Sequence, residues 1–463
     1  MSQHESKIEV EKLRNSCKKW LSPNYDTDFN LLRWAQAYSF NLNEASRWLI
    51  RHLKFRRFYD VDHIDQVPDD HVAKEYFPLG IVGLTGVDNR YLVIECAGKI
   101  DLEGLVQSVQ MTNFLTQRIK FQEQALRLLN EQEKQTQKQS SCVYVLDLDG
   151  LHFSRSLLNI VTGQYRILWA FVYTNYPEWI STFYVINAPS FMPIVWKAMS
   201  ALMPERTRNK VQFFAGRNQW QPELLKLCHA SNLPEHWGGT LVDSKGDPMC
   251  RERLNIPSEK IPRDLFWTPT QESPHWSQLD LLVLGPASSV LKKFKLTHAE
   301  KCYFVLNIYV ERIWSVAMFY SKDTSERDIQ KMEEWWPDQE YPGMPTVDLL
   351  KVPLPGPGIY FLRFGNENSW FRSLSIYYRS FSGSDEIELP QNTPLLCKKA
   401  ITECKEVAEI FAFKCEEFYG QQMSHFPAKE NLRPPEDIAL SHEERYWLPY
   451  ENRHLNEQLA ADL

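Results

Sequence analysis

The feature that most constrains the fold is a series of short apolar runs between residues 76 and 245. These runs are continuous rather than alternating, which is typical of strands buried on both faces of a sheet. They lie at 91–94, 143–146, 183–186 and 211–214 and are separated by longer stretches with helical spacing. Because a parallel strand connection needs a long crossover, these stretches favour parallel pairing. The region 76–245 is therefore predicted to be an α/β domain with a mainly parallel sheet.

Four other regions flank this predicted domain. Residues 1–75 carry aromatic and leucine side chains at helical spacing and predict a helical N-terminal lobe. The prolines of the next region, 246–275, predict a linker. Period-two alternation at 370–378, together with the stretches 302–310, 313–320 and 358–364, predicts an antiparallel β-sandwich over 276–383. In the last region, 384–463, we expect a helix over 392–420, packed on the sandwich or on a partner, followed by a polar tail.

Composition narrows the classes of function. Apolar residues make up 43% and charged residues 24% of the chain, the balance of a globular protein. A net charge of -7 provides no broad basic field, which argues against nucleic acid as the main partner. The first 20 residues lack the apolar core of a signal peptide and no long apolar run occurs, so we expect a cytoplasmic protein. The nine cysteines are scattered and never form C-x-x-C, which argues against disulfides or a metal site.

One segment is unusually apolar for a helix at a surface. Residues 191–203 read FMPIVWKAMSALM, in which only Pro193, Lys197 and Ser200 break the apolar pattern. As a helix it would span roughly 20 Å, too short to cross a bilayer and long enough to close a pocket. The preceding stretch, 160–176, is rich in aromatic residues, and Arg166 is its only formal charge. Two interpretations stay open: both helices are buried core, or they enclose an apolar cavity with the methionine-rich segment as a lid.

Short motifs in this half of the chain resemble those of the CRAL-TRIO lipid-binding family. Residues 28–34 read DFNLLRW, as in the opening helix of that family, and residues 176–178 read YPE. VINAP at 185–189 and LPEHWGGT at 233–240 follow in the same order as in the family. The second half is similar to a GOLD domain, through Val352, Pro353 and the stretch PGIYFLRF at 357–364. This combination resembles supernatant protein factor and the tocopherol-associated proteins, over about residues 20–380.

The resemblance implies a cytosolic protein that encloses a hydrophobic lipid behind a mobile gate helix and exchanges it at membranes as a peripheral protein. Residues 191–203 correspond to the gate helix. Phosphatidylinositol-binding members hold the headgroup at positions matching Thr207 and Lys210, and Glu178 also matches a headgroup-side position. From the apolar runs and this resemblance together, the pocket is predicted to be lined by Trp169, Tyr173, Phe183, Val185, Ile194, Val195, Met199, Leu202 and Phe213.

The sequence departs from the family at the end of the opening helix. Gln36 and Tyr38 stand where the family has two arginines. Because a neutral side chain cannot offset a phosphate charge, this favours a less charged lipid over an inositol phosphate. The candidates are a phospholipid, a tocopherol-like lipid or an isoprenoid. For Thr207 and Lys210, ordinary surface polarity at a helix end is the competing interpretation.

Two functions of other classes compete with a lipid carrier. Residues 143–150 read VYVLDLDG and resemble the D-x-D-G motif of haloacid-dehalogenase phosphatases, in which two carboxylates act with magnesium. That chemistry needs acids after later strands, and the segments 187–189 and 215–217 contain none. The other alternative is a non-catalytic adaptor in membrane trafficking or signalling that recruits a protein partner through the GOLD-like domain or the C-terminal helix. We expect no catalytic residue and no cofactor other than the bound lipid.

Overall fold

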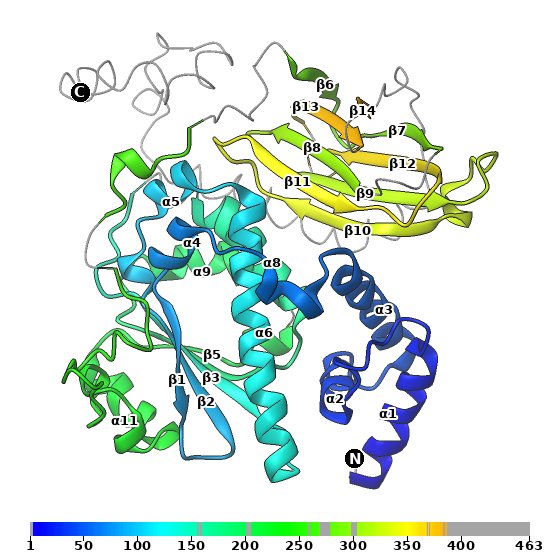
Figure 1. The fold of residues 1–463 in the computed structure, drawn as a ribbon. Helices are drawn as coiled ribbons and strands as arrows, with labels where there is room; N and C mark the ends of the chain where they lie inside the picture. The colour runs from blue at the N-terminus through cyan, green and yellow to red at the C-terminus, as the bar shows by residue number, and fades with distance from the viewer. Residues whose placement is uncertain are drawn as a thin grey trace, which may run out of the picture. The chain divides into compact units, whose positions relative to one another are not determined.

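The structure analysed is a computed structural model, which describes residues 3–154, 157, 160–200, 205–257, 260–268, 278–297, 303–367, 369, 371–382 and 385–386 (Figure 1). The chain divides into two compact units. The first unit contains residues up to 105 together with 113–261, and the second contains 106–112 together with the residues from 262 onward.

Residues 106–112 belong to the second unit, although the sequence pattern placed them inside the region 76–245. Within the second unit, the Thr112 hydroxyl donates to an Asp348 carboxylate oxygen at 2.7 Å, and the Gln110 amide donates to the Val347 carbonyl at 2.6 Å. Burial raises the pKa of Asp348 to about 6. Side-chain hydrogen bonds between residues far apart in the sequence produce no periodic pattern. The sequence therefore did not predict that residues 106–112 belong to the second unit.

The helices at the start of the first unit form the predicted lobe. They are α1 (Gln3–Cys17), α2 (Asp28–Ala37), α3 (Leu42–Phe58) and α4 (His71–Glu75). Three of them begin at a side-chain cap, in which Thr27, Asn41 and Asp70 each accept a hydrogen bond from a backbone N–H of the first turn. Apolar side chains of this lobe, including Leu31 and Trp34, form a buried cluster that Leu126, from outside the lobe, also joins.

The sheet of the first unit has five strands in the order β1-β2-β3-β4-β5. These are β1 (Leu79–Leu84), β2 (Arg90–Glu95), β3 (Ser141–Asp147), β4 (Ile180–Ile186) and β5 (Val211–Phe213). β1 is antiparallel to β2, and every other neighbouring pair is parallel. The prediction of a mainly parallel sheet is therefore confirmed, with strands at all four apolar runs.

Helices cover both faces of this sheet (Figure 1). Because side chains alternate along a strand, Tyr184 and Ile186 of β4 lie on one face, where they pack with Trp220 of α11 (Arg217–Leu227). Phe183 lies on the opposite face, where it contacts Trp169 of α8 (Arg166–Asn175). We call these the α11 face and the α8 face. Helix α6 (Met111–Thr136) also lies on the α8 side of the sheet in Figure 1.

The second unit contains two antiparallel sheets, as predicted. One sheet has the order β10-β9-β12-β7, and in the other β11, β8, β13 and β14 are successive neighbours while β6 also pairs with β13. Ring pairs join the two sheets, since Phe294 of β7 lies 5.3 Å from Phe304 of β8 and Phe364 of β12 lies 5.2 Å from Tyr378 of β13. The strands are β6 (Asp280–Leu284), β7 (Ser289–Leu296), β8 (Tyr303–Tyr309), β9 (Trp314–Ser321), β10 (Glu333–Tyr341), β11 (Asp348–Pro353), β12 (Gly358–Gly365), β13 (Leu374–Ser382) and β14 (Asp385–Glu386).

One predicted strand begins later than expected, and one predicted helix is not described. The alternation from 370 to 378 predicted a strand over that whole range, but β13 begins at Leu374 and the Phe371 side chain is 79% exposed. The helix expected over 392–420 lies outside the described residues. Among the helices that the structure describes, none combines the length and the hydropathy needed to cross a bilayer.

Candidate functional site

The α8 face of the first sheet carries a cluster of aromatic rings around Trp169. The Trp169 ring lies 5.4 Å from Tyr173, 5.6 Å from Phe183 and 5.5 Å from Tyr144. Val185 is buried and shares the face of β4 with Phe183. Four of the predicted lining residues, Trp169, Tyr173, Phe183 and Val185, are thus brought together on one face.

Part of the predicted lid is described beside this face. Helix α9 (Met192–Ser200) forms where the apolar segment predicted a helix, and it packs against a single π-helical turn, η3 (Val161–Tyr165). Val195 is buried, and Trp196 lies 5.0 Å from Phe213, which is 37% exposed. Phe213 therefore lies at a rim rather than in the interior. The side chains of Ile194 and Met199, and the whole of Leu202, lie outside the described residues.

A carboxyl group is buried among the aromatic rings of the α8 face. Glu95, the last residue of β2, is 0% exposed and accepts hydrogen bonds from the hydroxyls of Tyr144 and Tyr165. Burial raises the pKa of Glu95, and the positive charge of Arg118 opposes that shift. The sequence analysis did not identify Glu95, although a glutamate that ends an apolar strand run is a visible signal. The α8 face is therefore mainly apolar and contains one buried polar group, formed by Glu95 and the hydroxyls of Tyr144 and Tyr165.

The predicted headgroup residues meet at the other end of β4. The Lys210 ammonium lies 3.0 Å from both oxygens of Glu178 and donates to the Ile180 carbonyl at 2.8 Å. Thr207 lies in the preceding short helix, α10 (Glu205–Arg208), and its carbonyl accepts the Lys210 backbone N–H at 3.1 Å. The structure adds a residue that the sequence analysis missed, because Arg206 Nε lies 2.8 Å from Glu178 Oε1.

Arg206 also contacts the end of the opening helix, where the sequence departs from the family. Its guanidinium donates to the backbone carbonyl of Gln36, one of the two positions where the sequence departs from the family. Two cations therefore surround the single carboxylate of Glu178. The backbone of Glu178 has a φ of 55°, a left-handed conformation that costs free energy for a non-glycine residue and often occurs at functional sites. The sequence alone could not place Arg206 beside Gln36, because 170 residues separate them.

The motif that resembled a phosphatase has a structural role. Asp147 is buried, and its two carboxylate oxygens accept hydrogen bonds from Asn187 Nδ2 at 2.8 Å, Asp149 N at 3.0 Å and Trp237 Nε1 at 2.9 Å. Asn187 in turn accepts a hydrogen bond from Trp220 Nε1 at 3.0 Å. These bonds connect β3, β4, α11 and the LPEHWGGT motif. A carboxylate engaged by three N–H donors is not presented for attack on phosphorus, so the phosphatase interpretation is not supported.

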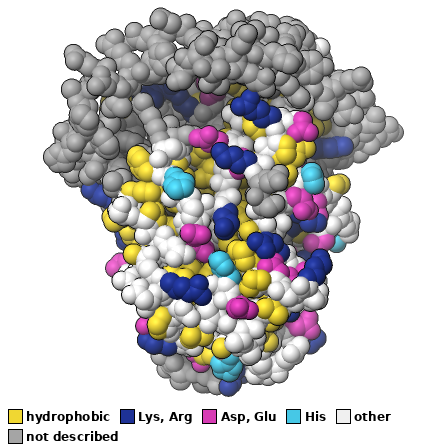
Figure 2. Space-filling model, turned by 90° about the vertical axis from the view of Figure 1, so that its left-hand side faces the viewer, with side chains coloured by type: hydrophobic (Ala, Val, Ile, Leu, Met, Phe, Trp, Pro, Cys, Tyr) yellow, Lys and Arg dark blue, Asp and Glu magenta, His cyan; other side chains and the backbone are white. Residues whose placement is uncertain are grey.

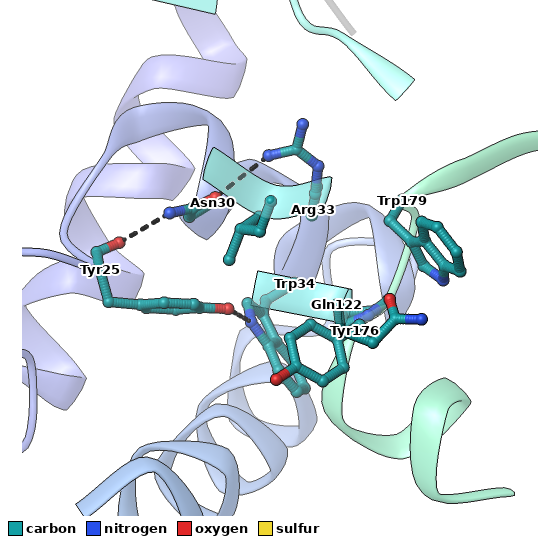
Figure 3. Close-up of a pocket in the computed structure, with 9 residues that line it drawn as sticks. Tyr25, Asn30, Arg33, Trp34, Gln122, Tyr176 and Trp179 are labelled. Atoms are coloured by element: carbon teal, nitrogen blue, oxygen red, sulfur yellow. Dashed lines mark hydrogen bonds between the residues drawn. The ribbon is translucent and has the colours of Figure 1, made fainter. Parts of the chain in front are cut away.

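A small cavity lies between the N-terminal lobe and the rest of the first unit (Figure 3). Its volume of about 10 Å³ matches about one water molecule, so it is not a site for a lipid chain. Three of the residues that line it carry a buried donor, Arg33 Nε, Gln122 Nε2 or Trp179 Nε1, with no hydrogen-bond partner in the described part of the chain. The residues that line it are Tyr25, Asn30, Arg33, Trp34, Gln122, Leu126, Tyr176, Pro177 and Trp179.

The outer surface beside α11 has mixed charge. Figure 2 shows Lys and Arg side chains interspersed with Asp and Glu over this side of the first unit. Such a surface is typical of a face that meets solvent. Within the part of the chain that the structure describes, no three His, Cys, Asp or Glu side chains gather in a way that could hold a metal ion.

Three protein families match parts of this chain. Residues 78–239 match the family described as CRAL/TRIO domain, and residues 265–389 match the family described as F28H7_8_C:-like, C-terminal domain. Residues 2–64 match a domain of unknown function, DUF8435. No match to a GOLD domain is among these, so that resemblance stays a prediction.

Known proteins resemble the chain over most of its length. A Caenorhabditis elegans protein named CRAL-TRIO domain-containing protein F28H7.8 is 30% identical over 368 residues, which is 78% of this chain and 86% of that protein. Protein ctg-1 of the same organism is 22% identical over 76% of this chain and 90% of its own length. A solved structure described as the crystal structure of Sfh5 is 17% identical, with a TM-score of 0.40, and the match covers 56% of this chain and 94% of that chain.

Proposed function

The chain belongs to the CRAL-TRIO family, whose members generally bind lipophilic ligands, and from this premise we propose that it carries a hydrophobic lipid on the α8 face, beneath α9. In this proposal the protein works in the cytoplasm and exchanges its lipid at membrane surfaces, with α9 as the moving lid. The observation that carries the proposal is the aromatic cluster of Trp169, Tyr173 and Phe183, which α9 adjoins through the π-helical turn.

The physical requirement on such a site is a surface nearly as apolar as a membrane. Moving a lipid chain from a bilayer into water costs about 0.8 kcal/mol per methylene, hence on the order of 25 kcal/mol for two long chains. A carrier therefore has to keep the chains away from water throughout. The predicted lining set, Trp169, Tyr173, Phe183, Val185, Ile194, Val195, Met199, Leu202 and Phe213, is apolar apart from one phenol, and we propose it as the pocket wall.

We further propose that Glu178, Arg206, Thr207 and Lys210 meet the polar end of the lipid. Two cations against one carboxylate leave a single net positive charge, which suits a headgroup with one negative charge better than a multiply phosphorylated one. This agrees with the neutral side chains of Gln36 and Tyr38, which stand where the family has two arginines.

An adaptor role for the second unit is supported by a separate observation. Leu281 and Val283 of β6 are 55% and 58% exposed, and among the described strands β6 pairs only with β13. Apolar side chains that project from an edge strand are typical of surfaces that bind another protein. The GOLD-like resemblance points to the same role. This function is compatible with lipid binding by the first unit.

Mass spectrometry of lipid extracted from the purified full chain tests the carrier function. We expect a bound lipid in the wild type and roughly tenfold less in Val195→Trp, about 1.4 kcal/mol of binding free energy, because the larger ring would take up space that the proposed pocket offers to the lipid. Val242→Trp is the matched control, since Val242 is 41% exposed and we expect unchanged loading there.

Circular dichroism checks that both variants are folded. A folded Val195→Trp protein with normal loading would refute the pocket assignment. A wild-type protein that carries no lipid, and takes none from vesicles, would refute the carrier function and leave the adaptor.

A further inference from the structure

The hydroxyl of Tyr173 lies on the α8 face and has no role in the function proposed above. Its oxygen is buried and has no hydrogen-bond partner among the residues that the structure describes. The Tyr173 ring stacks on Trp169 with an interplanar angle of 27°, and Trp169 contacts Phe183 of the sheet. A buried hydroxyl without a partner costs free energy, so a fold keeps one where something else completes the bond.

Neighbouring polar groups are already engaged with one another. Glu95, whose charge acts on Tyr173, accepts hydrogen bonds from the hydroxyls of Tyr144 and Tyr165. Among the described residues, the Tyr173 hydroxyl thus keeps an open hydrogen-bonding position, whereas those of Tyr144 and Tyr165 are engaged. It lies within the predicted lining set, on the same helical face as Trp169.

We propose that the Tyr173 hydroxyl is a specificity-determining group, which donates a hydrogen bond to a neutral oxygen of the bound lipid. This inference rests on the proposed function, since it assigns the ligand class of the same pocket. The class is a lipid with a carbonyl, ester or hydroxyl oxygen that reaches the α8 face, in preference to a pure hydrocarbon of the same length.

The chemistry of the wall explains why the oxygen should be neutral. Burial raises the pKa of Tyr173, which therefore remains a neutral donor at physiological pH. The surrounding rings of Trp169 and Phe183 offer no counter-charge, and burying an unpaired ion is far more costly than burying a neutral oxygen. A charged lipid group is better placed at Glu178 and Lys210, where charged side chains are present.

Competitive loading with a matched lipid pair tests this assignment. Delipidated full-length protein is offered 2-octadecanone and octadecane together, delivered from cyclodextrin, and the bound lipid is measured by mass spectrometry. We expect the wild type to prefer the ketone by about tenfold, the factor that one buried hydrogen bond commonly provides. Tyr173→Phe should load both lipids with no preference.

Tyr184→Phe is the matched control, because it makes the same chemical change in the same unit but on the α11 face. We expect this variant to keep the wild-type preference. If the wild type loads both lipids equally, or if Tyr173→Phe keeps the preference, this inference is wrong and the carrier function still stands. If neither lipid loads onto the wild type, the proposed function itself fails.

Discussion

The two faces of the first sheet are built from the same strands and differ in how their polar groups are satisfied. On the α11 face, Asp147 accepts a hydrogen bond from the indole of Trp237, and Asn187 accepts one from the indole of Trp220. On the α8 face, the Tyr173 hydroxyl has no hydrogen-bond partner within the described residues, and a carboxyl, Glu95, is buried among phenols. A π-helical turn also lies on the α8 side, a feature that frequently marks functional sites.

This difference separates a face that holds the fold together from a face that is available to a ligand. A core that only stabilises a protein leaves few polar groups unpaired. Unpaired polar atoms and irregular helix geometry persist where function requires them. The comparison predicts that equivalent substitutions on the two faces have different consequences.

The largest effect on stability is expected at the centre of the α11 face. Trp237→Ala removes a fully buried indole that also donates to Asp147, and we expect it to lower the free energy of unfolding of the first unit by about 3–5 kcal/mol. Hydrogen exchange of the β3 and β4 amides measures this loss. Trp20→Ala, at a half-buried position of the lobe, should leave those amides protected. A loss below about 1 kcal/mol would mean that the α11 face is not the structural core.

The same acid-to-amide change on the two faces gives a matched comparison. In Asp147→Asn, the new amide N–H group faces N–H donors, which cannot accept a hydrogen bond. This change should therefore lower the free energy of unfolding by about 2–3 kcal/mol. Glu95→Gln should cost less than about 1 kcal/mol, because the hydroxyls of Tyr144 and Tyr165 can rotate and accept. Urea unfolding followed by tryptophan fluorescence measures both. Equal costs would remove the distinction between the faces.

The buried carboxyl of the α8 face also predicts a dependence on pH. Burial raises the pKa of Glu95 in the folded protein, so the folded chain binds this proton more tightly than the unfolded chain does. The free energy of unfolding should therefore fall as pH rises from the ordinary glutamate pKa through the raised value, by about 1.4 kcal/mol for each unit of difference. Thermal unfolding at several pH values should show this fall in the wild type relative to Glu95→Gln. Parallel curves for the two proteins would contradict it.

The smallest effect is expected where a hydroxyl has no partner. Tyr173→Phe removes a buried group that makes no hydrogen bond, so stability should be unchanged or should rise by less than about 1 kcal/mol. Tyr144→Phe removes a hydroxyl that donates to Glu95 and should lower stability by about 1–2 kcal/mol. Differential scanning calorimetry of the ligand-free proteins compares the two. A clear loss of stability in Tyr173→Phe would show that its hydroxyl has an internal partner.

The sequence predicted the parts of the fold that depend on periodicity. Continuous apolar runs located β2 to β5, the stretches at 302–310, 313–320 and 358–364 located β8, β9 and β12, and the alternation at 370–378 located most of β13, because burial of strand faces produces these patterns. The sequence did not predict that residues 106–112 belong to the second unit, where they form hydrogen bonds with Val347 and Asp348. Polar residues that pair over such long sequence separations follow no regular spacing, so the sequence pattern does not reveal them.

The candidate site was predictable to a similar degree. Apolar lining residues such as Trp169 and Phe183 came from the apolar runs together with the family resemblance, and Glu178 and Lys210 came from the resemblance alone. Arg206 and Glu95 were missed, because their importance depends on neighbours that only the fold brings close. The unpaired state of the Tyr173 hydroxyl is likewise a property of three-dimensional packing.

Photo-crosslinking with a diazirine-bearing lipid tests the central claim most directly, that the α8 face and not the α11 face receives the lipid. The lipid is loaded onto the full chain, irradiated, and the modified residues are mapped by peptide mass spectrometry. The account predicts crosslinks in α8 (Arg166–Asn175) and at Phe183 and Val185. Crosslinks concentrated in α11 (Arg217–Leu227), or spread over the outer surface without preference, would contradict it.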